Sequence, residues 1–275
     1  MLLNFTKMEG TGNDFVVVDA RTQPVTLDAQ QIRILSDRRT GIGFDQLLLI
    51  EAASLPAHHC AYRIFNADGQ SVQQCGNGAR ALAAYVGAAL PPANPIHMES
   101  PAGVVHAEVL PGDLVRVNMG VPEFDPAALP FSAPVQATEY VLDTESQCVE
   151  FGAVSLGNPH AVIPVTDVDQ APVETVGALL QKHPAFPESV NVGFAQVLNP
   201  GALRLRVYER GVGETLACGT GACAAAAVCQ MLGQVGKEVR ILMRGGELLV
   251  SWAGDGQTIW LTGPCNRVFE GQIEL

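Results

Sequence analysis

The chain repeats itself, and this repeat limits the folds that it can adopt. "RIFNADGQSVQQCGNGARA" from Arg63 aligns with "RVYERGVGETLACGTGACA" from Arg206 at an offset of 143 residues. "GNDFVVV" from Gly12 aligns with "GNPHAVI" from Gly157 at nearly the same offset, 145 residues. Because the matches occur in the same order in both halves, they indicate a gene duplication that produced two domains of one architecture.

Both halves predict the same series of strands and helices. In each half, an apolar strand precedes an amphipathic helix, two further strands follow, and the cysteine-glycine motif opens an alanine-rich helix. The tail, 266–275, is too short to be a domain, and we expect it to pair with the first half. The expected ranges are 15–18, 29–39, 47–50, 61–65 and 76–90 in the first half, and 161–165, 173–183, 192–197, 203–208 and 219–232 in the second. The fold class is therefore α+β, with mostly antiparallel strands.

Composition excludes several classes of partner. A formal net charge of −12 without a cluster of Lys or Arg disfavours nucleic acid and anionic membranes. The sequence has no apolar run of about 20 residues that would span a membrane and no signal-peptide pattern at its start, so we expect a cytoplasmic protein. None of the seven cysteines forms a C-x-x-C pair, and "HHC" at 58–60 lacks partners at ligand spacing. We therefore expect reduced thiols and no metal.

The two cysteine motifs place a thiol at the head of a helix. Unpaired N–H groups and the helix dipole favour an anion there, and at roughly 0.3–2 kcal/mol they lower the thiol pKa by about one unit. The glycines of "CGNG" and "CGTG" let backbone N–H groups approach a ligand closely. If the two helix heads face each other, a carboxylate fits between them, with one thiol on either side of its α-carbon.

The whole chain resembles the diaminopimelate epimerase family. The resemblance rests on "MEGTGNDF", "GFDQ", "FNADG", "CGNGAR", "GNPHAV", "VNV", "YERGVGETLACGTGA" and the late "GP" segment, in the family's order. It implies two pseudo-symmetric domains, 1–118 plus 264–275 and 119–263, each a sheet or barrel around a central helix. It further implies a cytoplasmic homodimer that uses no cofactor. Its activity would be the interconversion of LL- and meso-diaminopimelate, a small-molecule amino acid used in lysine and peptidoglycan-precursor biosynthesis.

The same resemblance assigns roles to individual residues. Cys75 and Cys218 would be the acid and base, exchanging roles with the direction of reaction, and His160 and Glu209 would tune the two thiols. Arg210 would bind the distal carboxylate of the substrate. The other five cysteines are expected to be buried, small apolar residues. The remaining substrate-binding positions implied are Asn13, Gln46, Asn66, Gly76, Asn77, Asn158, Asn191, Gly219 and Thr220, together with Glu209.

Three alternatives remain open. "GNGARA" and "GTGACA" fit the loose G-x-G-x-x-A dinucleotide pattern, but neither opens a clear βαβ unit followed by a ribose-binding acid, which disfavours a nicotinamide oxidoreductase. A racemase of the proline racemase type shares "CGTG" with the second motif. A thiol-disulfide sensor would use the same two cysteines without epimerisation.

Overall fold

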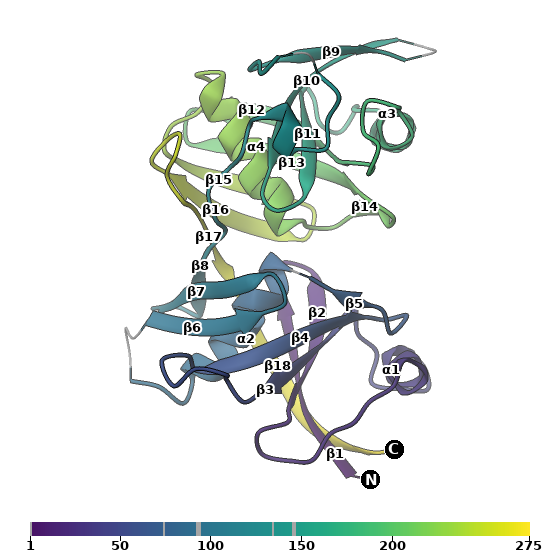
Figure 1. Cartoon of the computed structure of the whole chain (residues 1–275), viewed down its shortest axis with the longest axis vertical. Helices are drawn as coiled ribbons and strands as arrows, with labels where there is room; N and C mark the ends of the chain where they lie inside the picture. Colours follow the sequence, from purple (N-terminus) through teal and green to yellow (C-terminus); the bar gives the residue numbers. More distant parts are fainter. Residues whose placement is uncertain (1, 74, 92–94, 134, 145–146) are drawn as a thin grey trace. The chain divides into compact units, whose positions relative to one another are not determined.

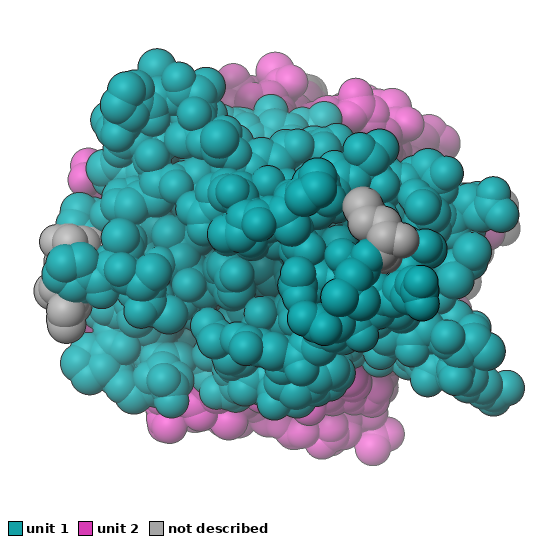
Figure 2. Space-filling model, turned by 90° about the horizontal axis from the view of Figure 1, so that it is seen from below, with its two compact units in different colours: residues 1–118, 262–275 teal, residues 119–261 magenta. Residues whose placement is uncertain are grey.

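The computed structural model describes residues 2–73, 75–91, 95–133, 135–144 and 147–275. It divides into two compact units, residues 1–118 with 262–275 and residues 119–261, which are coloured separately in Figure 2. Each unit contains one of the two cysteine motifs and combines strands with a few helices. The expected α+β class is confirmed.

Unit 1 has a long hairpin at its amino end, and the carboxyl-terminal strand completes it. β1 pairs with both β2 and β18, all antiparallel, so the tail returns to the first unit as expected. The remaining strands of this unit continue from β2 around the helix α2 (Figure 1). The elements are β1 Leu2–Gly10, β2 Asn13–Asp19, α1 Ala29–Ser36, β3 Gln46–Glu51, β4 Cys60–Asn66, β5 Ser71–Val72, α2 Gly76–Gly87, β6 Pro95–Ser100, β7 Gly103–Leu110, β8 Leu114–Asn118 and β18 Asn266–Glu274.

Unit 2 is built in the same order around the helix α4. It begins with an additional strand, β9, which pairs with β10 in an antiparallel hairpin. The elements are the 3-10 helix Pro126–Ala128, β9 Tyr140–Asp143, β10 Cys148–Ser155, β11 Pro159–Pro164, α3 Val173–Gln181, β12 Asn191–Asn199, β13 Ala202–Glu209, β14 Gly213–Thr215, α4 Gly219–Met231, β15 Glu238–Met243, β16 Gly246–Trp252 and β17 Ile259–Pro264.

Strand pairing repeats between the two units. In unit 1, β2 is parallel to β3, β3 is antiparallel to β4, and β4 is parallel to β6. In unit 2, β11, β12, β13 and β15 follow the same pattern. The sequence predicted that neither cysteine motif belongs to a clear βαβ unit. This prediction is wrong in one respect, because each motif lies between two strands that pair in parallel. A short hairpin strand, β5 or β14, separates the first of these two strands from the helix.

The two alanine-rich helices are buried at the centre of their units. The strands that contact α2 are β1, β2, β3, β6, β7, β8 and β18, and α4 packs against β10, β11, β12, β13, β15 and β16. Ten residues of α4 are buried, mostly alanine, glycine and cysteine, because a helix enclosed by strands has room only for small side chains. Within the described part of the chain, no helix combines the length and the apolar character that crossing a membrane requires.

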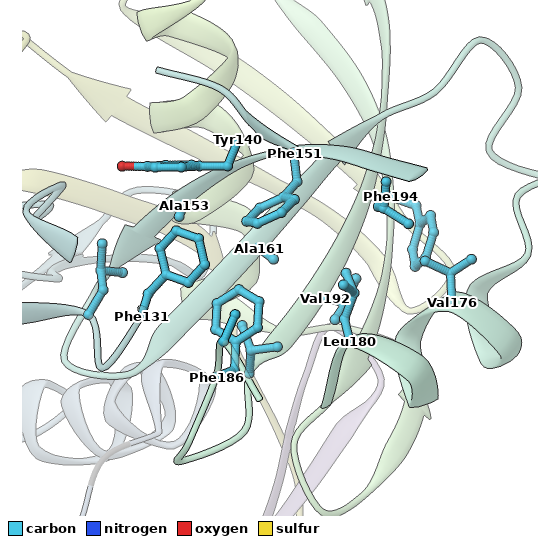
Figure 3. Packing of buried hydrophobic residues seen from close by; sticks show 14 of the residues in the cluster. Phe131, Tyr140, Phe151, Ala153, Ala161, Val176, Leu180, Phe186, Val192 and Phe194 are labelled. Atoms are coloured by element: carbon cyan, nitrogen blue, oxygen red, sulfur yellow. The ribbon is translucent and has the colours of Figure 1, made fainter. Parts of the chain in front are cut away.

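An aromatic cluster forms part of the core of unit 2 (Figure 3). Phe131 stacks on Phe186 with ring centroids 4.7 Å apart, and its edge meets Tyr140 at 4.8 Å. Phe151 of β10 lies 5.7 Å from Phe131. These rings join the segment that follows α3 and the segment before β9 to the sheet, since burial of large aromatic surfaces dominates core energetics.

The structure corrects three details of the expected elements. α2 ends at Gly87 rather than at 90, because glycine favours termination and the following residues form i→i−3 turns, with Ala89 N donating to Val86 O at 3.2 Å. α1 and α3 are short, with 8 and 9 residues. Cys148 is exposed rather than buried, and its thiol donates to Asp143 Oδ1 at 2.8 Å across the β9–β10 pair.

Close packing of β10 on α4 generates a stability prediction. A Cβ atom added at Gly152 would collide with the side chain of Val228. We expect Gly152→Ala to lower the free energy of unfolding by about 1–3 kcal/mol through overpacking. Denaturant unfolding measures this change. Gly201→Ala, where the new Cβ would lie 3.5 Å from Asn199 Oδ1, is the control and should change stability by less than about 0.5 kcal/mol. Equal midpoints for the two variants would contradict the packing described.

Candidate functional site

Cys75 is the N-cap of α2 in unit 1. Its backbone is extended, with φ −146° and ψ 113°, and its Sγ accepts a hydrogen bond from Gly78 N–H at 3.4 Å. A Cβ at position 78 would lie 3.2 Å from Leu48, which is a tight contact, and 3.6 Å from the Cys75 Sγ, which is an ordinary one, so glycine mainly allows the helix head to approach β3. Gly76 and Asn77 begin the helix and have no carbonyl partner within it for their N–H groups. Those two N–H groups are available to an anion.

A fully buried arginine supports this helix head. Arg80 Nη1 donates to Asn77 Oδ1 at 2.9 Å, and Arg80 Nη2 donates to Thr11 Oγ1 at 2.9 Å. Thr11 and Gly12 form the turn between β1 and β2, with positive φ values of 58° and 79°. The guanidinium therefore joins the first turn of α2 to the "TGN" turn and places a permanent positive charge inside unit 1.

Three amide side chains extend along neighbouring strands of unit 1. Gln46 Nε2 donates to Asn66 Oδ1 at 3.0 Å, linking β3 to the end of β4. Gln46 Oε1 is buried, and no hydrogen bond reaches it within the described part of the chain. Asn13 Nδ2, at the start of β2, donates to Asp45 Oδ2 at 2.8 Å. A buried amide oxygen without a partner is suited to accept from an ammonium group of a ligand.

A charged network fixes the strand ends that carry these amides. Arg38 donates to both Asp14 oxygens, at 2.8 and 2.7 Å, and to Asp45 at 2.8 Å. Lys7, itself buried, pairs with Asp14 at 2.6 Å and donates to the carbonyl of Gly43. Partial burial raises the pKa of Asp14, but the hydrogen bonds from Arg38 and Lys7 outweigh it and hold that pKa far below its usual value.

Cys218 occupies the corresponding place in unit 2, as the N-cap of α4. Its φ of −133° and ψ of 114° repeat the extended backbone of Cys75, and Gly221 N–H donates to its Sγ at 3.4 Å. Thr220 Oγ1 lies 3.5 Å from the same sulfur. A Cβ at position 221 would lie 3.3 Å from Sγ and 3.0 Å from Val207. The duplicated motif thus gives the same sulfur and N–H geometry twice.

The Cys218 thiol faces a carboxylate, unlike the arrangement at the head of α2. Its hydrogen bond goes to Glu209, at the end of β13, which also accepts from Thr215 Oγ1. Burial raises the pKa of Glu209, and the hydrogen bonds from Thr215 and Cys218 oppose this rise. Burial, followed by the charge of Glu209, raises the pKa of Cys218 well above its usual value. The expected lowering by the helix is wrong here, because it is smaller than these two effects.

His160 reaches the Cys218 sulfur through two other side chains. Its Nε2 lies 3.1 Å from Asn158 Oδ1, Asn158 Nδ2 donates to Thr220 Oγ1 at 3.4 Å, and Thr220 contacts Sγ. Burial, helped by the charge of Arg210, lowers the pKa of His160 to about 3. The imidazole is therefore neutral at pH 7, and Nε2–H is the donor to Asn158.

Asn191 fixes the turn that follows Glu209. It lies beside His160 in the parallel β11–β12 pair, and its Nδ2 donates to Pro159 O at 3.1 Å. Its Oδ1 accepts from Arg210 N at 2.9 Å. The exposed Arg210 guanidinium contacts the carbonyl of Glu188 at 2.9 Å. Four of its five N–H donors are not used in that contact, which suits recognition of a carboxylate.

The expected site residues fall into two groups, one in each unit. Unit 1 brings together Cys75, Gly76 and Asn77 at the helix head and joins Gln46 to Asn66, while Asn13 is held by Asp45. Unit 2 links Cys218, Glu209, Thr220, Asn158 and His160 in one hydrogen-bonded group. Asn191, Arg210 and Gly219 complete it.

Sequence reasoning missed the residues that support both groups. Arg80 and Thr215 lie inside the quoted motifs "CGNGAR" and "GETLACGTG", but a motif alone does not reveal which side chains they contact. Asp14 and Asp45 had a weak signal, since each adjoins an expected pocket amide. Among the described residues, no three His, Cys, Asp or Glu side chains are grouped so that they would hold a metal ion.

Comparison with known proteins decides between the alternatives. The model of the family described as diaminopimelate epimerase matches residues 5–124 and 152–268. Curated diaminopimelate epimerases of Chromobacterium violaceum and Pseudomonas aeruginosa are 51% and 49% identical to this chain, each over the whole of both chains. The chain belongs to the diaminopimelate epimerase family. It is therefore an isomerase, and the expected family and enzyme class are confirmed.

Solved structures show that the fold extends beyond this family. A hydroxyproline epimerase from Agrobacterium vitis, with bound trans-4-hydroxy-L-proline, has a TM-score of 0.70 at 19% identity, covering 99% of this chain and 92% of that chain. A PhzF-family phenazine biosynthesis protein from Bacillus anthracis has a TM-score of 0.70 at 16% identity, with full coverage of both chains. At such identities the likeness concerns the fold alone. The proline racemase alternative therefore has weaker support than the diaminopimelate epimerase family, and neither the nicotinamide nor the sensor interpretation gains any.

The network around Asp14 predicts a pH-dependent effect on stability. We expect Asp14→Asn to lower the free energy of unfolding at pH 7 by about 1–3 kcal/mol, since it removes the charged acceptor of Arg38 and Lys7. Because the pKa of Asp14 is lower in the folded protein, the wild type loses this stabilisation as pH falls below about 4. Denaturant unfolding from pH 7 to pH 3 should show the two proteins converging. Glu238→Gln, at an exposed carboxylate, is the control, and a constant difference across that range would contradict the assignment.

Proposed function

We propose that this chain interconverts LL- and meso-diaminopimelate by a two-base mechanism in which Cys75 and Cys218 act on opposite faces of the α-carbon. The observation that carries the proposal is the repeated helix head, with a thiol capping a buried helix and N–H groups beside it that the helix does not use. Membership of the diaminopimelate epimerase family supplies the substrate. No cofactor is part of this mechanism.

The proposed reaction consists of two proton transfers. The thiolate of one cysteine takes the α-proton, which forms an S–H bond and leaves the electron pair on the α-carbon and its carboxylate. The thiol of the other cysteine then gives its proton to the opposite face, which inverts the centre and leaves a thiolate. N–H groups at Gly76, Asn77, Gly219 and Thr220 stabilise the charge that develops on the carboxylate. In the reverse direction the two thiols exchange roles.

Electrostatics favours Cys218 as the protonated member of the pair in the resting enzyme. Its thiol is buried and donates to the Glu209 carboxylate, and both effects disfavour its thiolate. Once it has given up its proton, the same surroundings make it a strong base for the reverse reaction. The charge of Arg80 lies in the unit that holds Cys75, where it supports an anion at the helix head.

The polar groups of the two units would read the rest of the substrate. Arg210 provides a planar, permanently charged partner for the distal carboxylate. The buried Gln46 oxygen and the side chains of Asn66, Asn158 and Asn191 are suited to the second amino acid centre, which is not inverted. Neutral His160 holds Asn158, and Asn158 in turn orients the Thr220 hydroxyl beside Cys218.

Two further expectations from the family resemblance remain proposals. We expect a homodimer, which sedimentation velocity would detect as a species of twice the 29.0 kDa chain mass. We also expect the enzyme to work in the cytoplasm, where free thiols stay reduced. The structure places none of the seven cysteines in a disulfide.

The proposed function predicts the effect of removing each thiol. Cys75→Ala and Cys218→Ala should each reduce kcat for LL-diaminopimelate by about 10³-fold or more, because each removes one of the two proton carriers. A coupled assay or chiral chromatography measures the interconversion. Cys148→Ala, at an exposed cysteine outside both helix heads, is the matched control and should retain full activity. Near-normal turnover by either of the first two variants, with a native circular dichroism spectrum, would rule out the two-base assignment.

A further inference from the structure

A hydroxyl holds the carboxylate that faces the Cys218 thiol. Thr215 Oγ1 donates a short hydrogen bond to Glu209 Oε1 across the β13–β14 hairpin. Glu209 pairs with Gly213 and Val207 pairs with Thr215, so Glu209 and Thr215 are diagonal neighbours on one face. Gly213 has no side chain, which leaves the Glu209 carboxylate free to lean across it. The hairpin is built so that the hydroxyl meets the carboxylate.

The first repeat gives an internal comparison. Asn66 occupies the position of Glu209, and Val72 occupies that of Thr215 at the same offset of 143 residues. β5 pairs with β4 as β14 pairs with β13. The Asn66 amide oxygen is satisfied by Gln46 instead. The hydroxyl is thus present in the half that has a carboxylate and absent from the half that has an amide.

We propose that Thr215 is a positioning residue for the reaction, which keeps the Glu209 carboxylate ionised and oriented toward the Cys218 thiol. This inference rests on the proposed function, because it assumes that Cys218 carries a proton during epimerisation. Thr215 acts through Glu209. The Thr215 hydroxyl and the Cys218 thiol both donate hydrogen bonds to the Glu209 carboxylate.

Within the described residues of unit 2, few titratable groups face Glu209 on the inner side of the sheet. Cys218 faces it from α4, and neutral His160 lies on the same side of β11. On β12, the residues on this face are Asn191, Gly193 and Ala195, which do not titrate. Arg210 follows Glu209 in the chain. With so few charges nearby, hydrogen bonds to Glu209 have a large influence on its ionisation.

The other charged groups nearby belong to the outer face. Glu214 is bound there by Arg206 and Arg244, at 2.7 and 3.0 Å. α3 packs on that same face, where a Cβ at Gly177 would meet Tyr208. The charged residues of α3 and its C-cap are Glu174 and Lys182. Burial raises the pKa of Glu209, and the Thr215 hydroxyl is the first group that opposes this rise.

Loss of the hydroxyl therefore has a defined chemical consequence. Without this donor, the Glu209 carboxylate is less stabilised and takes up a proton at higher pH. A protonated Glu209 no longer acts as a charged acceptor for the Cys218 thiol, and the thiol loses its fixed orientation. Activity that depends on ionised Glu209 should then disappear at a higher pH than in the wild type.

The experiment compares Thr215→Val, which keeps the shape of the side chain, with Thr215→Ser, which keeps the hydroxyl. In protein labelled with ¹³C at the glutamate carboxyl, the Glu209 resonance is identified by its absence in Glu209→Gln. We expect its pKa to rise by about one unit in Thr215→Val and to return toward the wild-type value in Thr215→Ser. The acidic limb of kcat/KM for LL-diaminopimelate should move by the same amount. Thr215→Ala replaces Thr215→Val if the valine variant does not fold.

The outcomes separate this inference from the proposed function. An unchanged Glu209 pKa in Thr215→Val overturns the inference, whatever the enzyme does to its substrate. A raised pKa with an unmoved kcat/KM profile overturns the role in the reaction. The proposed function fails independently if the alanine variants of Cys75 and Cys218 keep their turnover, a result that the carboxyl titration does not affect.

Discussion

The two groups of site residues, one in each unit, depend on how closely a sulfur approaches the first turn of a buried helix. In both units a cysteine in extended conformation caps the helix, and the N–H of a glycine three residues later donates to Sγ at 3.4 Å. A side chain at either glycine would crowd a strand residue, Leu48 or Val207, and at Gly221 it would crowd the sulfur as well. The thiol, the helix N–H groups and the surrounding strands are therefore fixed together. This arrangement requires small residues along the helix, which explains why α2 and α4 are rich in alanine.

Duplication gave both units the same frame, and divergence gave them different charges. In unit 1, buried Arg80 supports the head of α2, while its counterpart in unit 2 is Cys223. In unit 2, Glu209 and Thr215 replace Asn66 and Val72. A reaction in which one thiolate takes a proton and the other thiol gives one benefits from this asymmetry, because one thiol must be ionised while the other is protonated. Glu209 acts directly on the Cys218 thiol, and Arg80 contacts Asn77 in the first turn of the helix that Cys75 caps, whereas the strand pairing is the same in both units.

Much of this fold follows from local sequence patterns, while the supporting contacts do not. The repeat predicted the strand order, and the helix starts expected at 29, 76 and 219 are those of α1, α2 and α4. Motif resemblance named the polar residues of both units. It did not reveal that the Cys218 pKa is raised, because burial depends on strands distant in sequence. Nor did it reveal the pairing of Arg80 with Thr11, residues 69 positions apart.

The central claim is that the proton removed and the proton returned are carried by different thiols. Its most direct test is epimerisation of LL-diaminopimelate in D₂O, stopped after a few per cent conversion and analysed by mass spectrometry. A two-base mechanism predicts that the meso product contains one deuterium at the inverted carbon, because the thiol that gives the proton has exchanged with solvent. The recovered LL substrate should contain none. Equal labelling of both pools, or a product that retains the original proton, would show a single base and contradict the account.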